Sequence, residues 1–210
     1  MVEHTPEERG VPGSNPGLGT KMKVIILEGI ATSGKTSVKN ELEKILKERG
    51  VNFTFVGEEE TLMPILNNTD SKINCDYLKS ILKKYFSNPT SDVIIFDRLY
   101  LSLIWRSKGN IKDFDECAEL LKDKNAIICF MKIPEEKISE RIKLALSHRD
   151  EKWIKYVKTK GDTTEKIISY YSNQQKQLLE LLKNISIPYQ IFDTGDMAFQ
   201  SIAQKISLLI

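Results

Sequence analysis

Five short apolar runs follow one another along the chain from residue 23 onward. The first is almost unbroken, which is the pattern of a strand buried on both faces of a parallel sheet. All five are rich in β-branched or aromatic residues, and enough chain for a helix separates each from the next. The runs are Lys23–Glu28, Val51–Val56, Val93–Asp97, Ala126–Met131 and Tyr189–Phe192. This alternation predicts an α/β fold with one five-stranded parallel sheet covered by helices.

Apolar residues at helical spacing predict the helices between these runs. One helix is expected over 35–49, because its apolar side chains share one face and Gly50 is a natural left-handed cap. Pro134 is expected at the first position of another helix. A long helix is expected to begin at Asp162, which forms a pattern like a capping box with Glu165. The chain shows neither an internal repeat nor a second apolar core, so 23–210 is predicted to form one domain.

Bulk composition excludes several classes of protein. The chain has 210 residues with 40% hydrophobic and 29% charged content, which fits one medium domain. Its net charge of only +2 does not indicate the strongly basic surface that binds duplex nucleic acid, so we expect no nucleic-acid partner. No run of about 18 apolar residues occurs, so we expect no membrane partner. The three scattered cysteines indicate reduced thiols rather than a zinc site, and we expect a cytoplasmic protein.

The first 22 residues differ in character from the rest. They are dense in glycine and proline and contain no apolar segment that could serve as the core of a signal peptide. A second methionine, Met22, directly precedes the first predicted strand. We therefore expect 1–22 to be a disordered leader or tag.

A glycine-rich motif lies between the first predicted strand and the first predicted helix. The pattern GxxxxGK[ST] wraps backbone N–H groups closely around phosphate oxygens, which a Cβ at the glycines would hinder. Lys35 would reach the β- and γ-phosphates, and Thr36 would ligate Mg²⁺. ATP and Mg²⁺ are therefore the expected cofactors. The residues expected to bind the nucleotide are Gly29, Ile30, Ala31, Thr32, Ser33, Gly34, Lys35, Thr36 and Ser37.

An acid and an arginine end the third apolar run. The carboxyl ends of parallel strands line the ligand crevice of an open sheet, so Asp97 is expected to face the glycine-rich motif. There it would hold Mg²⁺ together with Thr36, or accept a proton. Arg98 follows directly, and its guanidinium offers a fixed fork of donors for a phosphate.

These motifs resemble those of the thymidylate kinase and deoxynucleoside kinase group. The similarity covers nearly everything from Lys23 onward. It implies a P-loop NTP hydrolase-type three-layer α/β/α fold with a helical lid at about 134–160. It also implies transfer of the γ-phosphoryl group of ATP to a nucleoside or a nucleoside monophosphate, and homodimers are common in this group. The matching segments are Glu28-Gly29, Ser33–Ser37, Asp97–Ser102, Ile133–Glu136, Glu140–Ile142 and His148–Glu151.

The basic side chains of the implied lid suit phosphoryl transfer. They would neutralise charge and exclude water when both substrates are bound. Arg149 is the expected catalytic cation, and Arg141 is expected to bind the nucleotide. Lys143 and Lys152 are their neighbours.

The chain departs from the resemblance at the positions that identify the acceptor. Thymidylate kinases usually carry an acid where this chain has Ala31, and an arginine where it has Gly57. Deoxynucleoside kinases place a catalytic glutamate after the second strand, and Glu58 is the best-aligned candidate. The leading hypothesis is a thymidylate kinase-like enzyme (dTMP + ATP to dTDP + ADP). The alternatives are a deoxynucleoside kinase with Glu58 as general base, a P-loop NTPase switch, and an inactive ATP-binding protein.

Aromatic residues near these motifs are candidates for stacking on a nucleobase, although core packing is the commoner role of such side chains. They are Tyr77, Phe86, Tyr100 and Trp105.

Overall fold

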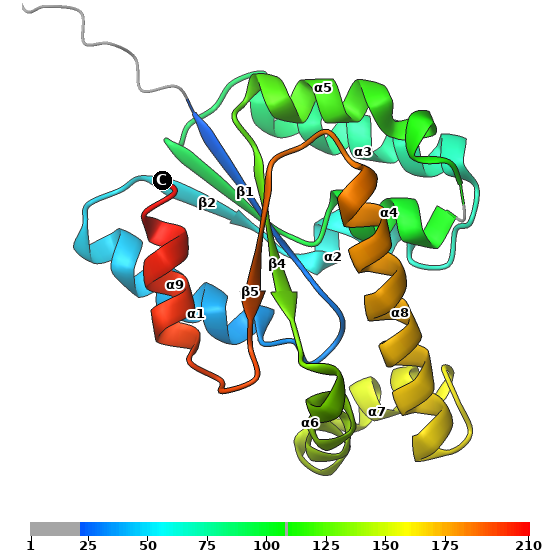
Figure 1. The fold of residues 1–210 in the computed structure, drawn as a ribbon. Coiled ribbons are helices and arrows are strands. Elements are labelled where there is room, and N and C mark those ends of the chain that lie inside the picture. Colours follow the sequence, from blue (N-terminus) through cyan, green and yellow to red (C-terminus); the bar gives the residue numbers. More distant parts are fainter. Residues whose placement is uncertain (1–21, 108) are drawn as a thin grey trace, which may run out of the picture.

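Five parallel strands form one sheet in the order β2-β3-β1-β4-β5 (Figure 1). The computed structural model describes residues 22–107 and 109–210, so the predicted leader lies outside the described residues apart from Met22, which is buried. The predicted parallel sheet is confirmed, with ends shifted by at most two residues. The strands are β1 (Lys23–Glu28), β2 (Phe53–Val56), β3 (Val93–Asp97), β4 (Ile127–Lys132) and β5 (Tyr189–Asp193).

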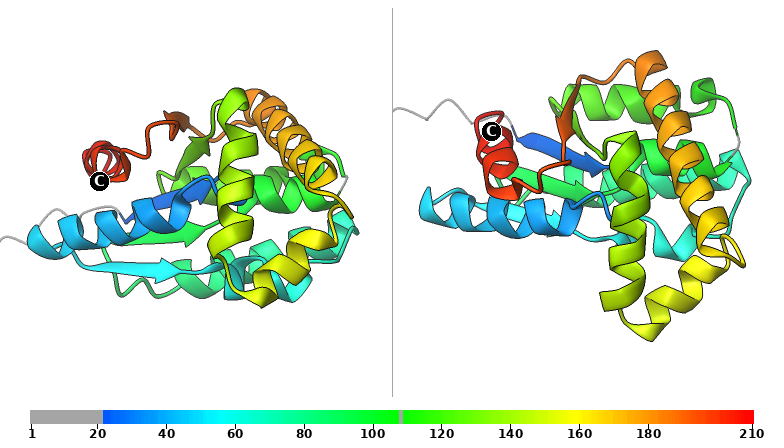
Figure 2. Two further views of the ribbon diagram at one scale, coloured as in Figure 1. Left: turned by 90° about the horizontal axis from the view of Figure 1, so that it is seen from below. Right: turned by 60° about the horizontal axis from the view of Figure 1, so that its bottom comes forward.

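Helices cover both faces of the sheet, giving three layers (Figures 1 and 2). Along β1, Val24 and Ile26 point into a core formed with α3, α4, α5 and α8, whereas Ile25 and Leu27 point into a core formed with α1 and α9. All four side chains are fully buried, as expected for a central parallel strand. The helices are α1 (Lys35–Glu48), α2 (Glu58–Thr61), α3 (Ser71–Phe86), α4 (Tyr100–Ser107), α5 (Asp115–Asp123), α6 (Glu135–His148), α7 (Glu151–Lys158), α8 (Thr164–Asn184) and α9 (Phe199–Ser207), with short 3₁₀ turns at Met63–Ile65 and Ile111–Phe114.

The strand order creates a crevice beside β1. Strand β1 is central: its neighbour is β3 on one side and β4 on the other, so the chain places strands on opposite sides of β1. Ligands bind at such a switch point, outside the carboxyl ends of the strands. Leu27 pairs with Asp97 there, so the end of β3 lies next to the chain that leaves β1. Beyond the same end of the sheet, α6 and α7 project from the body of the molecule (Figure 1).

Two predicted helix starts are wrong, and one predicted stop is confirmed. Pro134 is the N-cap of α6 rather than its first residue: its ψ is an extended 138°, while its carbonyl accepts a hydrogen bond from the Lys137 amide. The cap of α8 is Thr163, whose hydroxyl accepts from the Lys166 amide at 3.3 Å, while Asp162 pairs with the Lys166 ammonium instead. At the end of α1, Gly50 adopts a φ of 66°, as its position after the helix predicted.

The three cysteines are buried and free within the described part of the chain. The sulfur atoms of Cys75 in α3 and Cys117 in α5 lie 3.7 Å apart and form no disulfide. Among the described residues, every helix is too short or too polar to cross a membrane.

Candidate active site

The glycine loop, residues 29–36, turns sharply between β1 and α1. Gly29 and Gly34 have φ values of 142° and 92°, which residues with a Cβ rarely adopt. A Cβ on Gly29 would lie 2.6 Å from the carbonyl oxygen of Met131, and a Cβ on Gly34 would lie 2.2 Å from the ring of Phe199. Helix α1 begins at Lys35, so the amides of its first turn lack intrahelical partners. Loop and helix together form a cup that suits an anion.

Polar side chains in this cup have no partner among the described residues. The hydroxyls of Thr32 and Ser33 and one carboxylate oxygen of Asp97 are buried without a hydrogen bond. Such groups are costly unless a ligand or water satisfies them. They open onto a cavity of about 870 Å³, which Ala31 to Ser37 line. The size and the unpaired polar atoms suit a nucleotide with its phosphates at the loop.

Thr36 and Asp97 also fit a magnesium ion carried by a nucleotide. Mg²⁺ is usually held by one or two protein oxygens, together with water and substrate phosphates. Both residues line the cavity, and the unpaired carboxylate oxygen of Asp97 is the hard ligand that such an ion prefers. No cluster of three or more acidic, histidine or cysteine side chains that could hold a metal by itself occurs in the described ranges. The site therefore suits a metal that arrives with its phosphates.

Lys35 lies folded back over the loop. Its ammonium donates to the carbonyl oxygens of Gly29 and Ile30, both at 3.3 Å, and only 6% of the residue is exposed. Burial, and then the charge of Arg98, lower the pKa of Lys35 to about 8. Gly29 and Ile30 thus contribute carbonyls that hold Lys35; unlike Ala31 to Ser37, they are not part of the cavity lining.

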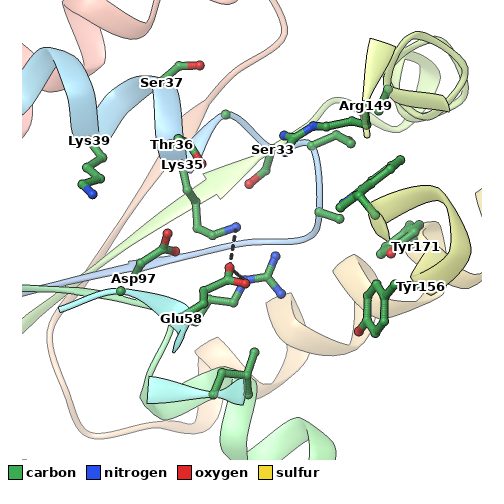
Figure 3. A pocket seen from close by; sticks show the side chains of 18 of the residues that line it. Ser33, Lys35, Thr36, Ser37, Lys39, Glu58, Asp97, Arg149, Tyr156 and Tyr171 are labelled. Carbon is green, nitrogen blue, oxygen red and sulfur yellow. Dashed lines mark ion pairs between the residues drawn. The ribbon is translucent and has the colours of Figure 1, made fainter. Parts of the chain in front are cut away.

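Glu58 stands between two cations at the start of α2 (Figure 3). Its Oε1 is 2.7 Å from Nε of Arg98 and 4.0 Å from Nζ of Lys35. Glu58 is the first residue of α2, directly after Gly57, and both residues line the cavity. The Glu58 carboxylate is half-buried there. Burial alone would raise the pKa of Glu58, but the charges of Arg98 and Lys35 outweigh it and hold the pKa below its ordinary value. Glu58 is therefore ionised at neutral pH.

The turn after β3 presents Asp97 and Arg98 to the same cavity. Arg98 has a φ of 55°, which is unusual for a residue with a side chain, and its amide donates to the carbonyl of Leu27 at 2.9 Å. The hydroxyl of Thr61 donates to the carbonyl of Asp97 at 2.8 Å. Burial raises the pKa of Asp97, with Lys35 opposing the shift. Lys35, Glu58, Asp97 and Arg98 thus line one cavity, and Asp97 lies beside the glycine loop as expected.

The predicted lid residues occupy two different environments. Arg149 is exposed, lines the cavity and lies 5.5 Å over the ring of Trp153. Arg141 also lines the cavity but is buried; it donates to the carbonyl of Thr194 and lies 5.8 Å from the ring of Phe199. Lys152 is part of the lining as well. The exposed guanidinium of Arg149 is able to reach a phosphate in the cavity. The guanidinium of Arg141 is instead held at the edge of the cavity by its bond to Thr194.

The predicted stacking residues lie away from the cavity. Tyr100 is buried against Phe114, and Trp105 donates to Gln177 at 2.6 Å. Tyr77 bonds to the backbone of Glu60. The rings that do line the cavity come mainly from α7 and α8. The lining residues that the sequence did not indicate include Arg106, Trp153, Tyr156, Tyr170, Tyr171 and Gln174.

Glu28 has a structural role that its sequence context did not predict. Its fully buried carboxylate accepts from the amides of Leu99 and Ser102 at 3.0 and 3.3 Å, and from the Ser102 hydroxyl at 2.6 Å. Burial raises the pKa of Glu28, against the opposing hydrogen bonds from Ser102 and Leu99. The carboxylate joins the end of β1 to the start of α4. The signal that could have indicated this role is an acidic residue at the end of an unbroken apolar run.

Replacing Glu28 with alanine should lower the free energy of unfolding by about 3 kcal/mol, because three buried donor groups then lose their acceptor. Glu28→Gln keeps an acceptor oxygen and should cost less than half as much. Urea denaturation monitored by circular dichroism measures both. An unchanged unfolding midpoint for Glu28→Ala would show that the carboxylate does not hold α4 in place.

Comparison with known proteins supports the architecture. No protein family and no curated protein matches this chain. The solved structure of APE1195 is similar over 90% of this chain and 95% of its own, with a TM-score of 0.50 and 13% sequence identity. At that identity the likeness concerns the fold alone. Sheet order, layers and comparison together define a P-loop-like three-layer α/β protein.

Proposed function

We propose that this protein is an ATP-dependent kinase that transfers a phosphoryl group to a nucleoside or a nucleoside monophosphate. The observation that carries the proposal is the convergence of Lys35, Glu58, Asp97 and Arg98 in one cavity at the end of the glycine loop. Figure 3 shows the first three of these side chains. Phosphoryl transfer needs little more from a protein than positioning and charge neutralisation, and these residues supply both.

Each group has a defined part in this proposal. The amides and hydroxyls of the glycine loop bind the phosphates of ATP, and Lys35 moves from the loop carbonyls to the β- and γ-phosphates. Thr36 and Asp97 hold the magnesium ion, which when bound neutralises phosphate charge. Arg149 approaches the transferred group from α6 and keeps water away from it.

The position of Glu58 favours a hydroxyl acceptor over a phosphate acceptor. A monophosphate needs cations free to bind it, but Arg98 is already paired with Glu58. A carboxylate beside the attacking oxygen would repel a charged phosphate, whereas it can take the proton of a hydroxyl. The 5′ oxygen then bonds to the γ-phosphorus as the bond to the β-phosphate oxygen breaks and ADP leaves. A nucleoside is therefore the acceptor that we propose first, and the thymidylate kinase-like reaction is the alternative.

An ADP-release assay with ATP and Mg²⁺ tests the proposal against a panel of nucleosides and their monophosphates, dTMP included. Lys35→Ala provides the blank. Turnover of nucleosides would support a hydroxyl acceptor. Turnover of monophosphates alone would support the thymidylate kinase-like reaction instead. ADP release that is independent of every acceptor would contradict both reactions and favour a hydrolytic switch.

The lowered pKa of Lys35 makes ATP binding depend on pH. Because the pKa is about 8 in the free protein, roughly half of the Lys35 side chains are neutral at pH 8. Polyphosphate favours the ammonium, so binding should take up nearly half a proton at pH 8, and affinity should fall as pH rises above 8. Calorimetric titration of Mg-ATP in two buffers of different ionisation enthalpy measures this uptake. Lys35→Arg stays charged and should take up none; equal uptake by both proteins would contradict the assignment.

A further inference from the structure

One wall of the cavity is aromatic and lies away from the glycine loop. It contains Tyr156 from α7 and Tyr170 and Tyr171 from α8. In Figure 3, Tyr156 and Tyr171 lie on the far side of Glu58 from Asp97. A molecule whose reacting oxygen sits at Glu58 would therefore extend toward these rings. Aromatic side chains pack well against flat rings, so this wall suits a planar heterocycle.

Gln174 brings an unpaired amide to the same wall. The residue is only 4% exposed, it lines the cavity, and its Oε1 has no hydrogen-bond partner among the described residues. Its neighbour Gln175 is equally buried but fully satisfied: its amide accepts from the Ile133 amide at 2.9 Å and donates to the Ile133 carbonyl at 2.7 Å. Consecutive glutamines of α8 thus serve different purposes. Gln175 anchors the helix to the chain after β4, and Gln174 offers its amide to the cavity.

Arg106 adds an unpaired donor to this part of the site. Its Nη1 donates to the carbonyl of Leu66 at 3.2 Å, and its Nη2 donates to the hydroxyl of Tyr156 at 3.4 Å. Its buried Nε has no partner within the described ranges. The wall therefore leaves one acceptor and one donor unsatisfied, both near tyrosine rings. The edge of a nucleobase carries both donors and acceptors, so a base against this wall offers partners of the kind that each atom lacks.

We propose that Gln174 is a specificity-determining residue that reads the edge of the acceptor's nucleobase, while Tyr156, Tyr170 and Tyr171 enclose its ring. This inference rests on the proposed function and adds the way in which the acceptor is chosen. A buried site built to hydrogen-bond one ring edge rejects a ring that leaves its polar groups unpaired.

The test separates base reading from a structural role of Gln174. The probes are nucleosides of adenine, cytosine, guanine and thymine, titrated calorimetrically into protein saturated with Mg²⁺ and a non-hydrolysable ATP analogue. Wild type should prefer one base, and Gln174→Leu should weaken binding of that base by about 10- to 100-fold, while the other bases change little. Gln177→Leu is the matched control on the same helix; Gln177 is exposed and bonds to Trp105 outside the cavity.

Three outcomes would overturn the inference. These are no binding of any nucleoside to wild type, an equal loss for every base in Gln174→Leu, and unchanged binding in that variant, which would mean that water satisfies Oε1. Melting temperatures of both variants show whether α8 remains packed. Failure of the proposed kinase function is distinct, because it appears as absent ADP release from ATP even when a base binds through Gln174.

Discussion

Replacing Lys35 with alanine is expected to lower kcat/KM for phosphoryl transfer by about 10³-fold. The ammonium is the group in the glycine loop best placed to leave its present partners, the carbonyls of Gly29 and Ile30, for the phosphates of ATP. Without it, charge that develops on the transferred group and on the leaving ADP meets no fixed cation at the loop. Steady-state ADP release with the preferred acceptor measures the loss, which should appear in kcat as well as in KM for ATP.

The control for this variant is another lysine of α1. Lys44 is exposed and pairs with Glu41 on the surface, so Lys44→Ala should change kcat/KM by less than threefold. Lys35→Ala also removes a buried charge whose pKa burial lowers, so the folded protein should not lose stability on that account. A melting temperature near that of wild type would confirm that lost activity reflects lost chemistry. Retention of more than a tenth of the activity by Lys35→Ala would contradict its role.

The sheet and the glycine loop could be predicted because each depends on local sequence. A strand such as β1 is apolar on both faces, since helices cover both sides, and this leaves an unbroken run in the sequence. The loop needs glycine where φ is positive, and Gly29 and Gly34 stand at such positions. Asp97 followed from a general property of parallel sheets, whose strand ends share one edge.

The aromatic wall could not be predicted, because tyrosines at helical spacing fit a core as well as a cavity. Tyr171 is buried in the core cluster and lines the cavity at the same time. Tyr100 was a candidate for stacking on a nucleobase, yet it packs against Phe114 and is not part of the cavity lining. Gln175 differs from Gln174 in that its amide bonds to the backbone of Ile133, which is about forty residues away in sequence.

Replacing Glu58 with glutamine is expected to lower the turnover of a nucleoside by about 10²- to 10⁴-fold, the usual contribution of a general base. Glutamine keeps the size of the side chain but cannot take up the proton of the 5′-hydroxyl. Arg98 and Lys35 lower the pKa of Glu58, so wild-type turnover should fall less between pH 7 and 5 than it would with an unperturbed glutamate as base. Initial rates across this range measure both effects.

Glu58→Gln is expected to affect a monophosphate acceptor differently from a nucleoside. Glu58→Gln removes the negative charge beside Arg98 and Lys35, so these cations become available to an acceptor phosphate. Turnover of a monophosphate should therefore hold steady or rise while that of the nucleoside falls. Glu60→Gln is the matched control on α2, because Glu60 bonds to Tyr85 and Lys84 away from the cavity. Nucleoside turnover within threefold of wild type in Glu58→Gln would show that Glu58 holds Arg98 in place rather than accepting a proton, and would return the monophosphate to first place as acceptor.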